Sequence, residues 1–156
     1  MMQRTLIILK PDTVQRGLVG EVVSRFERKG LKLVANKMTL LTGDILKEHY
    51  AHLVDKPFFP GIESFMKCSP VILQIWEGFG AIDVVRTMCG VTNSREASPG
   101  TIRGDLSSSY GSNIIHASDS PENAEAEVKR FFSDEEVFDY KKVIDQYSYS
   151  DDEKTH

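Results

Sequence analysis

One polar segment, residues 99–121, combines residue types that point to phosphate chemistry. Within it, Asn113-Ile114-Ile115 indicates a short strand, because β-branched residues fit a pleated surface. Ser120-Pro121 is a typical helix start, since serine caps free N–H groups and proline suits the first helical position. His116 is therefore expected where a strand has ended and a helix has not begun. Such a junction exposes a side chain near a helix N-terminus, where anions are favoured, and Arg103 adds a cation to the segment.

The familiar glycine-rich nucleotide signatures do not occur in the sequence. It contains no GxxxxGK[ST] motif, no GxGxxG after a strand, and no protein-kinase catalytic-loop set. A phosphate site in this chain must therefore be built mainly from side chains at the ends of elements. The candidates are Lys10 after the first predicted strand, Arg86 in the helix after the third, Thr92 and Arg103 in a long loop, and Asn113 and His116 at the last strand. Arginine offers bidentate hydrogen bonds to phosphate oxygens, and lysine offers a point charge.

Glu127 is the second informative residue. Ala124, Val128 and Phe131 define the buried stripe of a helix that follows His116, and Glu127 lies on the edge of this stripe. A carboxylate in that position needs a partner. It is either an exposed glutamate on the helix surface or a group that orients His116, directly or through Ser118.

The apolar pattern predicts an α+β fold. Apolar runs predict strands at 6–9, 71–76 and 113–115, and the alternation of Leu31, Leu33 and Ala35 with polar residues predicts a half-exposed strand at 31–35. Helical spacing predicts helices within 19–30, 42–53, 62–66, 81–89 and 121–131. A capping box at Ser133 predicts a final helix, whereas residues 91–112 show no periodicity and are expected to form a long functional loop. We expect a ferredoxin-like βαββαβ arrangement, in which helices cover a four-stranded antiparallel sheet and additional helices lie between the second and third strands. The order of the strands does not follow from the sequence.

The composition is that of an ordinary globular protein. A length of 156 residues fits one domain over 1–156, with 147–156 as a polar tail that frays or contacts a partner subunit. A net charge of −4 argues against nucleic acid as a partner. Two isolated cysteines suggest a reducing compartment. Since there is no apolar run long enough for a bilayer and no signal-peptide pattern, we expect a cytoplasmic protein without a membrane partner.

Several motifs resemble those of nucleoside diphosphate kinases. The sequence NIIHASDS at 113–120 looks like the active-site signature of that family, and the resemblance covers about residues 3–140. It includes KPD at 10–12, VQRG at 14–17, HY at 49–50, KPFF at 56–59, WEG at 76–78, TN at 92–93 and PGTIRGD at 99–105. Several independent motifs in the family's order make this a specific signal. The resemblance implies transfer of the γ-phosphate of a nucleoside triphosphate, typically ATP, to a nucleoside diphosphate by a ping-pong reaction through a phosphohistidine, with Mg²⁺ on the nucleotide.

The resemblance also implies roles for individual residues. It makes His116 the nucleophile, Ser118 and Glu127 the pair that holds it, and Lys10 a further catalytic group. It implies that the nucleotide is bound by Lys10, Tyr50, Leu53, Phe58, Arg86, Thr92, Arg103, Tyr110 and Asn113, with Phe58 as an aromatic lid against the base. Stacking on Phe58 is nearly indifferent to the base, because every base has a π-face.

Three positions depart from the family pattern. Tyr110 stands where the family has a smaller aliphatic residue that faces the base, Ser112 where arginine is usual, and Ser94 where proline is usual. The resemblance implies no metal ligated by the protein itself. It further implies a homo-oligomer, for which we favour a hexamer because of the extended tail, with a tetramer as the alternative.

Other interpretations of the same residues remain open at this stage. His116 alone would be read as a surface or capping histidine. His49 and His52 are three apart on a predicted helix, a spacing that metal ligands use, but we favour a structural role because no clustered ligand completes the site. The chain could also be a regulatory module that binds nucleotides or single strands without catalysis, or a purely structural assembly protein. An intact set of phosphate-binding side chains argues against both.

Overall fold

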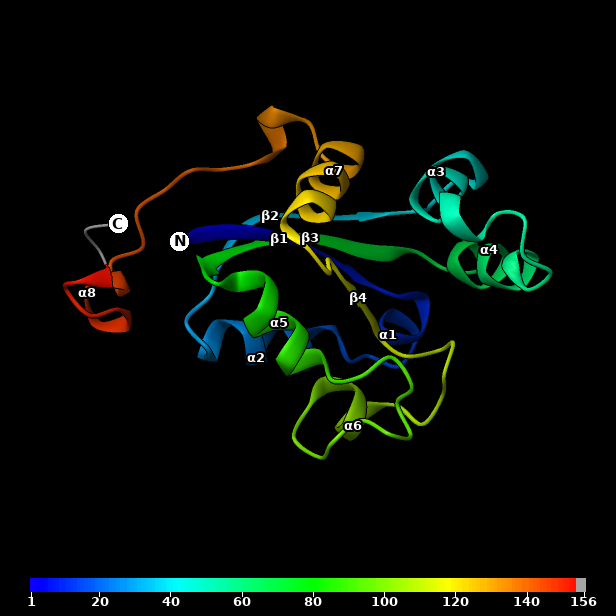
Figure 1. Cartoon of the computed structure of the whole chain (residues 1–156), viewed down its shortest axis with the longest axis horizontal. Helices are drawn as coiled ribbons and strands as arrows, with labels where there is room; N and C mark the ends of the chain where they lie inside the picture. Colours follow the sequence, from blue (N-terminus) through cyan, green and yellow to red (C-terminus); the bar gives the residue numbers. More distant parts are fainter. Residues whose placement is uncertain (154–156) are drawn as a thin grey trace.

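The central strand β1, Met2–Leu9, is built on the apolar run that begins at Leu6. In the computed structural model, which describes residues 1–153, β1 pairs with β3, Val71–Phe79, on one side and with β4, Ile115–Ala117, on the other. The strand β2, Lys32–Thr39, pairs with the far side of β3. All three pairs are antiparallel and give the order β2-β3-β1-β4 (Figure 1), which confirms the ferredoxin-like α+β fold.

Helices occupy the connections between the strands. They are α1, Pro11–Gln15; α2, Val19–Arg28; α3, Gly43–His49; α4, Phe59–Lys67; α5, Ala81–Cys89; α6, Ile102–Leu106; α7, Pro121–Phe131; and α8, Asp145–Ser148, with the 3₁₀ helices η1, Ala51–Leu53, and η2, Asp134–Glu136. The predicted caps are present, because Thr42 accepts a hydrogen bond from the amide of Ile45 and Ser120 accepts one from the amide of Asn123.

The core has two layers, one on each face of the sheet. On one face, α2, α5 and α6 pack against Ile7 and Trp76, and the Phe26 ring lies 5.3 Å from the Trp76 ring. On the other face, α3, α4 and α7 pack against Leu6 and Ile8. Figure 1 shows α7 and α3 on one side of the sheet and α2 and α5 on the other. Because alternate residues of β1 serve opposite layers, this strand needs the continuous apolar run that predicts it.

The alternation expected in β2 breaks at one residue. Leu33 pairs with Trp76 and Ala35 pairs with Ile75, so Val34 is the extra residue of a β-bulge. Both Val34 and Ala35 therefore pack into the same layer of the core. The prediction that polar residues alternate with apolar ones across this strand is wrong at the bulge.

The segment after η2 runs along the edge of β2. The amide of Phe138 donates to the Val34 carbonyl at 2.8 Å, and the Tyr140 hydroxyl donates to the Leu33 carbonyl at 2.8 Å. The chain then reaches α8, drawn in red in Figure 1, whose Ser148 lines a pocket together with Glu27 and Arg28 of α2. Of the predicted tail 147–156, residues 154–156 lie outside the part that the structure describes.

Two short elements differ from the sequence expectations. The capping box at Ser133 is present, but it opens only the three-residue helix η2 and not a longer final helix, because Val137 is already extended. The segment predicted as a loop contains α6, which Thr101 caps by accepting a hydrogen bond from the amide of Gly104. Within residues 1–153, no helix combines the length and the apolar character that crossing a membrane requires.

Candidate active site

His116 lies in the middle of β4, directly opposite Ile8 of β1. The sequence placed a strand at 113–115 and the histidine after it, and this placement is wrong by two residues, because β4 covers Ile115–Ala117. Ile8 is fully buried, so the core itself fixes the backbone that carries the histidine. The imidazole is partly exposed and faces a pocket.

The late start of β4 is explained by the backbone conformation of Ile114. This residue has a φ of 75°, a left-handed conformation that costs a β-branched residue about 1–3 kcal/mol. Its carbonyl accepts hydrogen bonds from the amide of Lys10, at 2.9 Å, and from the hydroxyl of Thr13. Its amide donates to the carboxylate of Asp12 at 3.0 Å. Lys10 and the helix α1 that follows it therefore hold both backbone groups of Ile114 and set the position at which β4 begins.

An acid holds the His116 ring. Nε2 of His116 lies 3.0 Å from Oε1 of Glu127, and the Ser118 hydroxyl donates to Oε2 at 2.5 Å. The amide of Leu6 donates to Oγ of Ser118 at 3.1 Å, which anchors the arrangement in β1. Burial raises the pKa of Glu127, but the hydrogen bonds from His116 and Ser118 outweigh this effect and the net pKa is lowered. A charged Glu127 favours the proton on Nε2 of His116, which leaves a free lone pair on Nδ1.

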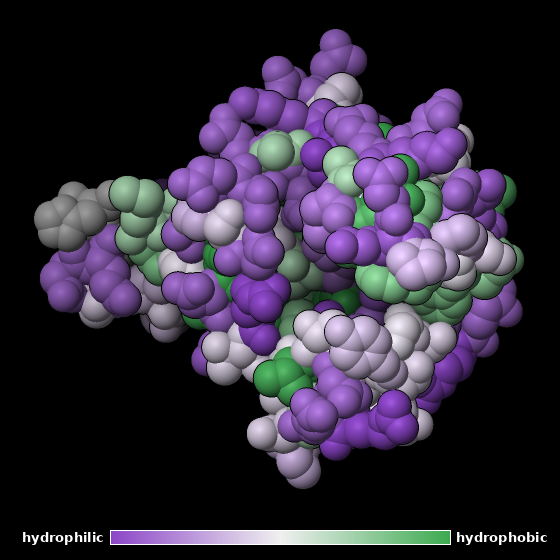
Figure 2. Space-filling model, turned by 45° about the vertical axis from the view of Figure 1, so that its right-hand side comes forward, coloured by the Kyte–Doolittle hydropathy of each residue, from purple (hydrophilic) through white to green (hydrophobic). Residues whose placement is uncertain are grey.

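The ring lines a pocket of about 540 Å³ between the sheet and the helices. Of the sequence candidates, the structure brings seven others to this lining: Lys10, Tyr50, Arg86, Thr92, Arg103, Asn113 and Glu127. Ser118 is fully buried behind Glu127. In Figure 2, the face turned forward is mainly hydrophilic and is hollowed near its centre. A polar cavity lined by several cations suits a phosphorylated ligand.

Lys10 is fixed at the pocket by a chain of hydrogen bonds. Its Nζ donates to Oδ1 of Asn113 at 2.6 Å, and Nδ2 of Asn113 donates to the carbonyl of Thr92 at 2.9 Å. Burial lowers the pKa of Lys10 to about 8, with a further lowering by the positive charge of Arg103. An ammonium group that has lost much of its hydration binds an incoming anion readily.

Arg103 mainly holds neighbouring backbone segments together through its guanidinium group. Its Nη2 donates to the carbonyl of Ile115 at 2.6 Å, Nη1 to that of Gly90 at 2.8 Å, and Nε to that of Asn113 at 3.3 Å. These bonds join the end of α5 to the start of β4, with the guanidinium at the wall of the pocket. Arg86, in the last turn of α5, lines the same wall.

Three sequence candidates for contact with the base lie outside the pocket lining. Phe58 precedes α4 and is 54% exposed, Tyr110 is 63% exposed, and Leu53 ends η1. Tyr50, by contrast, lines the pocket, and burial raises the pKa of its hydroxyl to about 12. It is therefore a neutral phenol at physiological pH.

Sequence reasoning undervalued His49 and did not single out Arg130. His49 ends α3, and its ring lies 4.6 Å from the His116 ring in an edge-on arrangement. Burial, followed by the charge of His116, lowers the pKa of His49 to about 3, so this imidazole is neutral. Nη1 of Arg130 lies 3.2 Å from Nδ1 of His49. Arg130 is three residues after Glu127 on α7, and this spacing could have placed it on the same face.

Comparison with known proteins gives a consistent result. Residues 3–137 match the family described as nucleoside diphosphate kinase. A nucleoside diphosphate kinase of Parabacteroides distasonis is 63% identical over 139 residues, which cover 89% of this chain and 91% of that protein. The halophilic nucleoside diphosphate kinase of Halobacterium salinarum in complex with CDP has a TM-score of 0.93 and 42% identity, covering 96% of this chain and all of that one. A transition-state mimic of the Borrelia burgdorferi enzyme with vanadate and ADP has a TM-score of 0.88 and 39% identity, covering 95% and 98%.

Proposed function

Because the chain belongs to the nucleoside diphosphate kinase family, we propose that it moves the γ-phosphoryl group of a nucleoside triphosphate to a nucleoside diphosphate by way of phospho-His116. The observation that carries this proposal is the pairing of Nε2 of His116 with Oε1 of Glu127 at 3.0 Å. It leaves Nδ1 as the nitrogen with a free lone pair, on a ring that lines a cationic pocket.

The reaction runs in two half-reactions at this nitrogen. Nδ1 attacks the γ-phosphorus, the N–P bond forms as the bond to the β–γ bridging oxygen breaks, and the nucleoside diphosphate leaves with the electron pair. The second nucleoside diphosphate then attacks the same phosphorus and restores the free imidazole. The proton on Nε2 stays in its hydrogen bond to Glu127 throughout, and the carboxylate stabilises the positive charge that develops on the ring.

The surrounding cations neutralise phosphate charge. Lys10 and Arg86 reach the pocket from β1 and α5, and Arg103 completes the wall between them. Phosphoryl transfer needs positioning and electrostatic stabilisation more than covalent help, so fixed cations supply much of the catalysis. We assign Thr92 and Asn113 to the phosphates and sugar, and Tyr50 to the entrance of the pocket.

Mg²⁺ fits this site as an ion carried by the nucleotide. Magnesium requires oxygen ligands, and both oxygens of Glu127 are engaged with His116 and Ser118. Asp119 also lines the pocket and offers an oxygen that could face a hydrated ion. When bound, Mg²⁺ would supply positive charge that offsets the charge of the phosphates.

The remaining parts of the proposal concern the base and the assembly. We assign Phe58, Leu53 and Tyr110 to contact with the base after nucleotide binding, since Phe58 and Tyr110 are exposed aromatic rings. The protein is proposed to act in the cytoplasm as a homo-oligomer, with a hexamer favoured over a tetramer. Its partners are nucleoside tri- and diphosphates.

The test is to incubate the protein with γ-³²P-ATP and Mg²⁺ and to look for a protein label that is acid-labile and base-stable. The wild type is expected to be labelled, and addition of a nucleoside diphosphate is expected to discharge the label as a triphosphate. His116→Ala is expected to abolish the label, and His52→Ala, at another of the three histidines of the pocket lining, serves as the matched control. An unlabelled wild type that still binds nucleotide would favour a binding module instead.

A further inference from the structure

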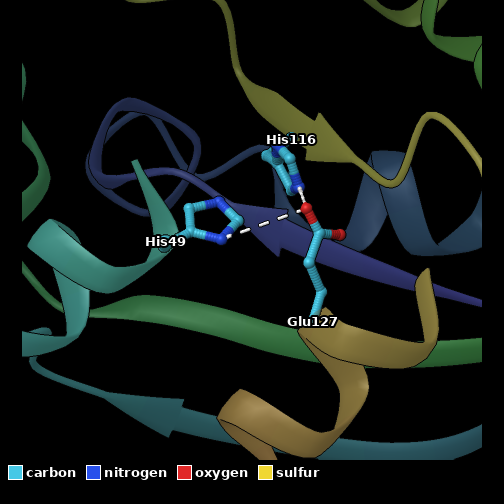
Figure 3. Close-up of side chains that lie close together, drawn as sticks. All are labelled: His49, His116 and Glu127. Atoms are coloured by element: carbon cyan, nitrogen blue, oxygen red, sulfur yellow. Dashed lines mark hydrogen bonds and ion pairs between the residues drawn. The ribbon is translucent and has the colours of Figure 1, made fainter. Parts of the chain in front are cut away.

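Two histidines and one glutamate converge within the pocket in an arrangement that phosphoryl transfer does not require. His49, His116 and Glu127 come from α3, β4 and α7, and we call them the His–His–Glu cluster. Figure 3 shows both imidazoles directed at the same carboxylate oxygen. One ligand atom from each residue lies within 4.8 Å of the other two. The transfer mechanism uses His116 and Glu127 and leaves the imidazole of His49 without a role.

The spacing of these atoms suits a tetrahedral metal ion. Oε1 of Glu127 lies 3.0 Å from Nε2 of His116 and 4.0 Å from Nδ1 of His49. Ligand atoms placed 2.0–2.1 Å from a tetrahedral zinc ion are separated by about 3.4 Å. These two distances lie on either side of this value, and the ligand atoms of the two histidines lie within 4.8 Å of each other, so modest shifts of the side chains bring the three atoms to bonding distance. Two histidines and one glutamate with an open fourth position form a known type of zinc ligand set.

The surroundings of the cluster also resemble those of a metal site. The Ser118 hydroxyl holds Oε2 of Glu127, which orients Oε1 toward the two rings as an outer-shell partner does. The His49 ring packs edge-on against Tyr50 and Phe131, at 4.6 and 5.2 Å, and this packing limits its rotation. His116 faces the pocket, which provides both a route of entry and room for a fourth ligand.

One group opposes a metal ion at this place. Nη1 of Arg130 lies 3.2 Å from the same Nδ1 of His49, and a bound cation must displace it. Arg130 has a second partner, because its Nε donates to the carboxylate of Glu48 at 3.1 Å. The guanidinium can therefore rotate toward Glu48 without losing that ion pair.

We propose that the His–His–Glu cluster binds a zinc-class divalent transition metal and that this binding inhibits the enzyme. Imidazole nitrogen selects such ions over magnesium, which prefers oxygen, so the site is distinct from the Mg²⁺ of the nucleotide. The inhibitory half of the proposal rests on the proposed phosphotransfer, whereas the binding half does not. A metal on Nε2 of His116 takes the lone pair of that nitrogen, so the single proton of the neutral imidazole moves to Nδ1. The nucleophilic lone pair is then lost.

Binding is measured first, by isothermal titration of ZnCl₂ into the nucleotide-free protein. The wild type is expected to bind one Zn²⁺ per chain, and His49→Gln is expected to bind it about tenfold or more weakly, since even outer-shell changes cost that much. His52→Gln, on a neighbouring histidine of the same pocket, is expected to match the wild type. Arg130→Gln is expected to bind Zn²⁺ more tightly, because the competing cation is gone. Equal affinity of the wild type and His49→Gln, or no binding by the wild type, would overturn the proposal.

A second measurement needs no variant and so does not depend on the folding of His49→Gln. In ¹⁵N-histidine-labelled wild type, Zn²⁺ is expected to shift the Nδ1 resonance of His49 and the Nε2 resonance of His116, and Mg²⁺ is expected to shift neither. A shift confined to His52 would refute the site. Inhibition is then read as the ratio of label formation with and without Zn²⁺ in each variant. If the protein forms no phosphohistidine at all, the proposed function fails while the titration still decides the metal site.

Discussion

The sharpest test of the proposed chemistry is the substitution Glu127→Gln. It keeps the shape of the side chain but replaces one acceptor oxygen with an amino donor and removes the charge. The wild-type carboxylate accepts two hydrogen bonds, from His116 at 3.0 Å and from Ser118 at 2.5 Å. A glutamine can satisfy only one of these donors with its oxygen. If the amino group faces the imidazole, the ring must present a lone pair at Nε2 and carry its proton on Nδ1, which removes the nucleophile.

The size of the effect follows from the charge on the acceptor. A hydrogen bond to a charged group contributes about 1.5–3 kcal/mol, against about 0.5–1.5 kcal/mol for a neutral pair. Glu127→Gln therefore loses about 1–2 kcal/mol of hydrogen-bond stabilisation. This loss raises the activation barrier, because the His116 ring becomes positive in the transition state. The rate of phosphohistidine formation is therefore expected to fall about 5- to 30-fold with the oxygen facing the ring, and further with the opposite orientation.

Rapid-quench measurement of label formation in a single turnover tests this expectation. Glu125→Gln is the matched control, because Glu125 lies on the same helix and forms an exposed ion pair with Lys129 at 2.5 Å. Its rate is expected to equal that of the wild type, since an exposed ion pair contributes little. A folded Glu127→Gln protein that is labelled within about twofold of the wild-type rate would refute the reasoning about the tautomer.

Three further outcomes are expected. Because the pKa of Lys10 is lowered to about 8, its ammonium is charged below that pH and neutral above it, so nucleotide affinity should fall as the pH rises through about 8. Calorimetry in buffers of different ionisation enthalpy should show that the wild type takes up protons when it binds nucleotide near this pH. The Lys10→Arg variant should show no such proton uptake. Phe26→Ala should lower the free energy of unfolding by about 3–5 kcal/mol in urea denaturation, because the buried ring packs on Trp76; unchanged stability would contradict the described core. Thr13→Val, which removes a hydrogen bond to the carbonyl of Ile114, should destabilise the protein by about 1–3 kcal/mol and slow labelling, and normal labelling would show that this contact does not position β4.

The sequence predicted those parts of the fold that local chemistry determines. The apolar run that begins at Leu6 predicted a central strand. The Ser120-Pro121 pair predicted the start of α7 at Pro121, where the structure has it. The helical stripe placed Glu127 at the boundary of the core, where the structure finds it buried and bonded to His116. In each case a few neighbouring residues carry the information.

Features that depend on tertiary contacts could not be predicted from neighbouring residues in the sequence. The start of β4 depends on the left-handed Ile114, which is held by residues about a hundred positions earlier in the chain. The helix α6 has five residues, including Gly104, and is too short for a periodic apolar pattern. The place of His49 beside His116 follows from the packing of α3 against α7, about which a single sequence carries no pairing information.

The pairing of β4 with β1 has a consequence for which residues around the ligand can be replaced. The imidazole takes its position from the buried half of β1, whereas Thr92 and Tyr110 are exposed residues of the segment between α5 and β4. Replacements at these two exposed positions can remodel the ligand-facing wall while the reacting nitrogen stays where β1 holds it. The contact with the base that we assign to Tyr110 and the position of the reacting nitrogen are thus carried by different parts of the architecture.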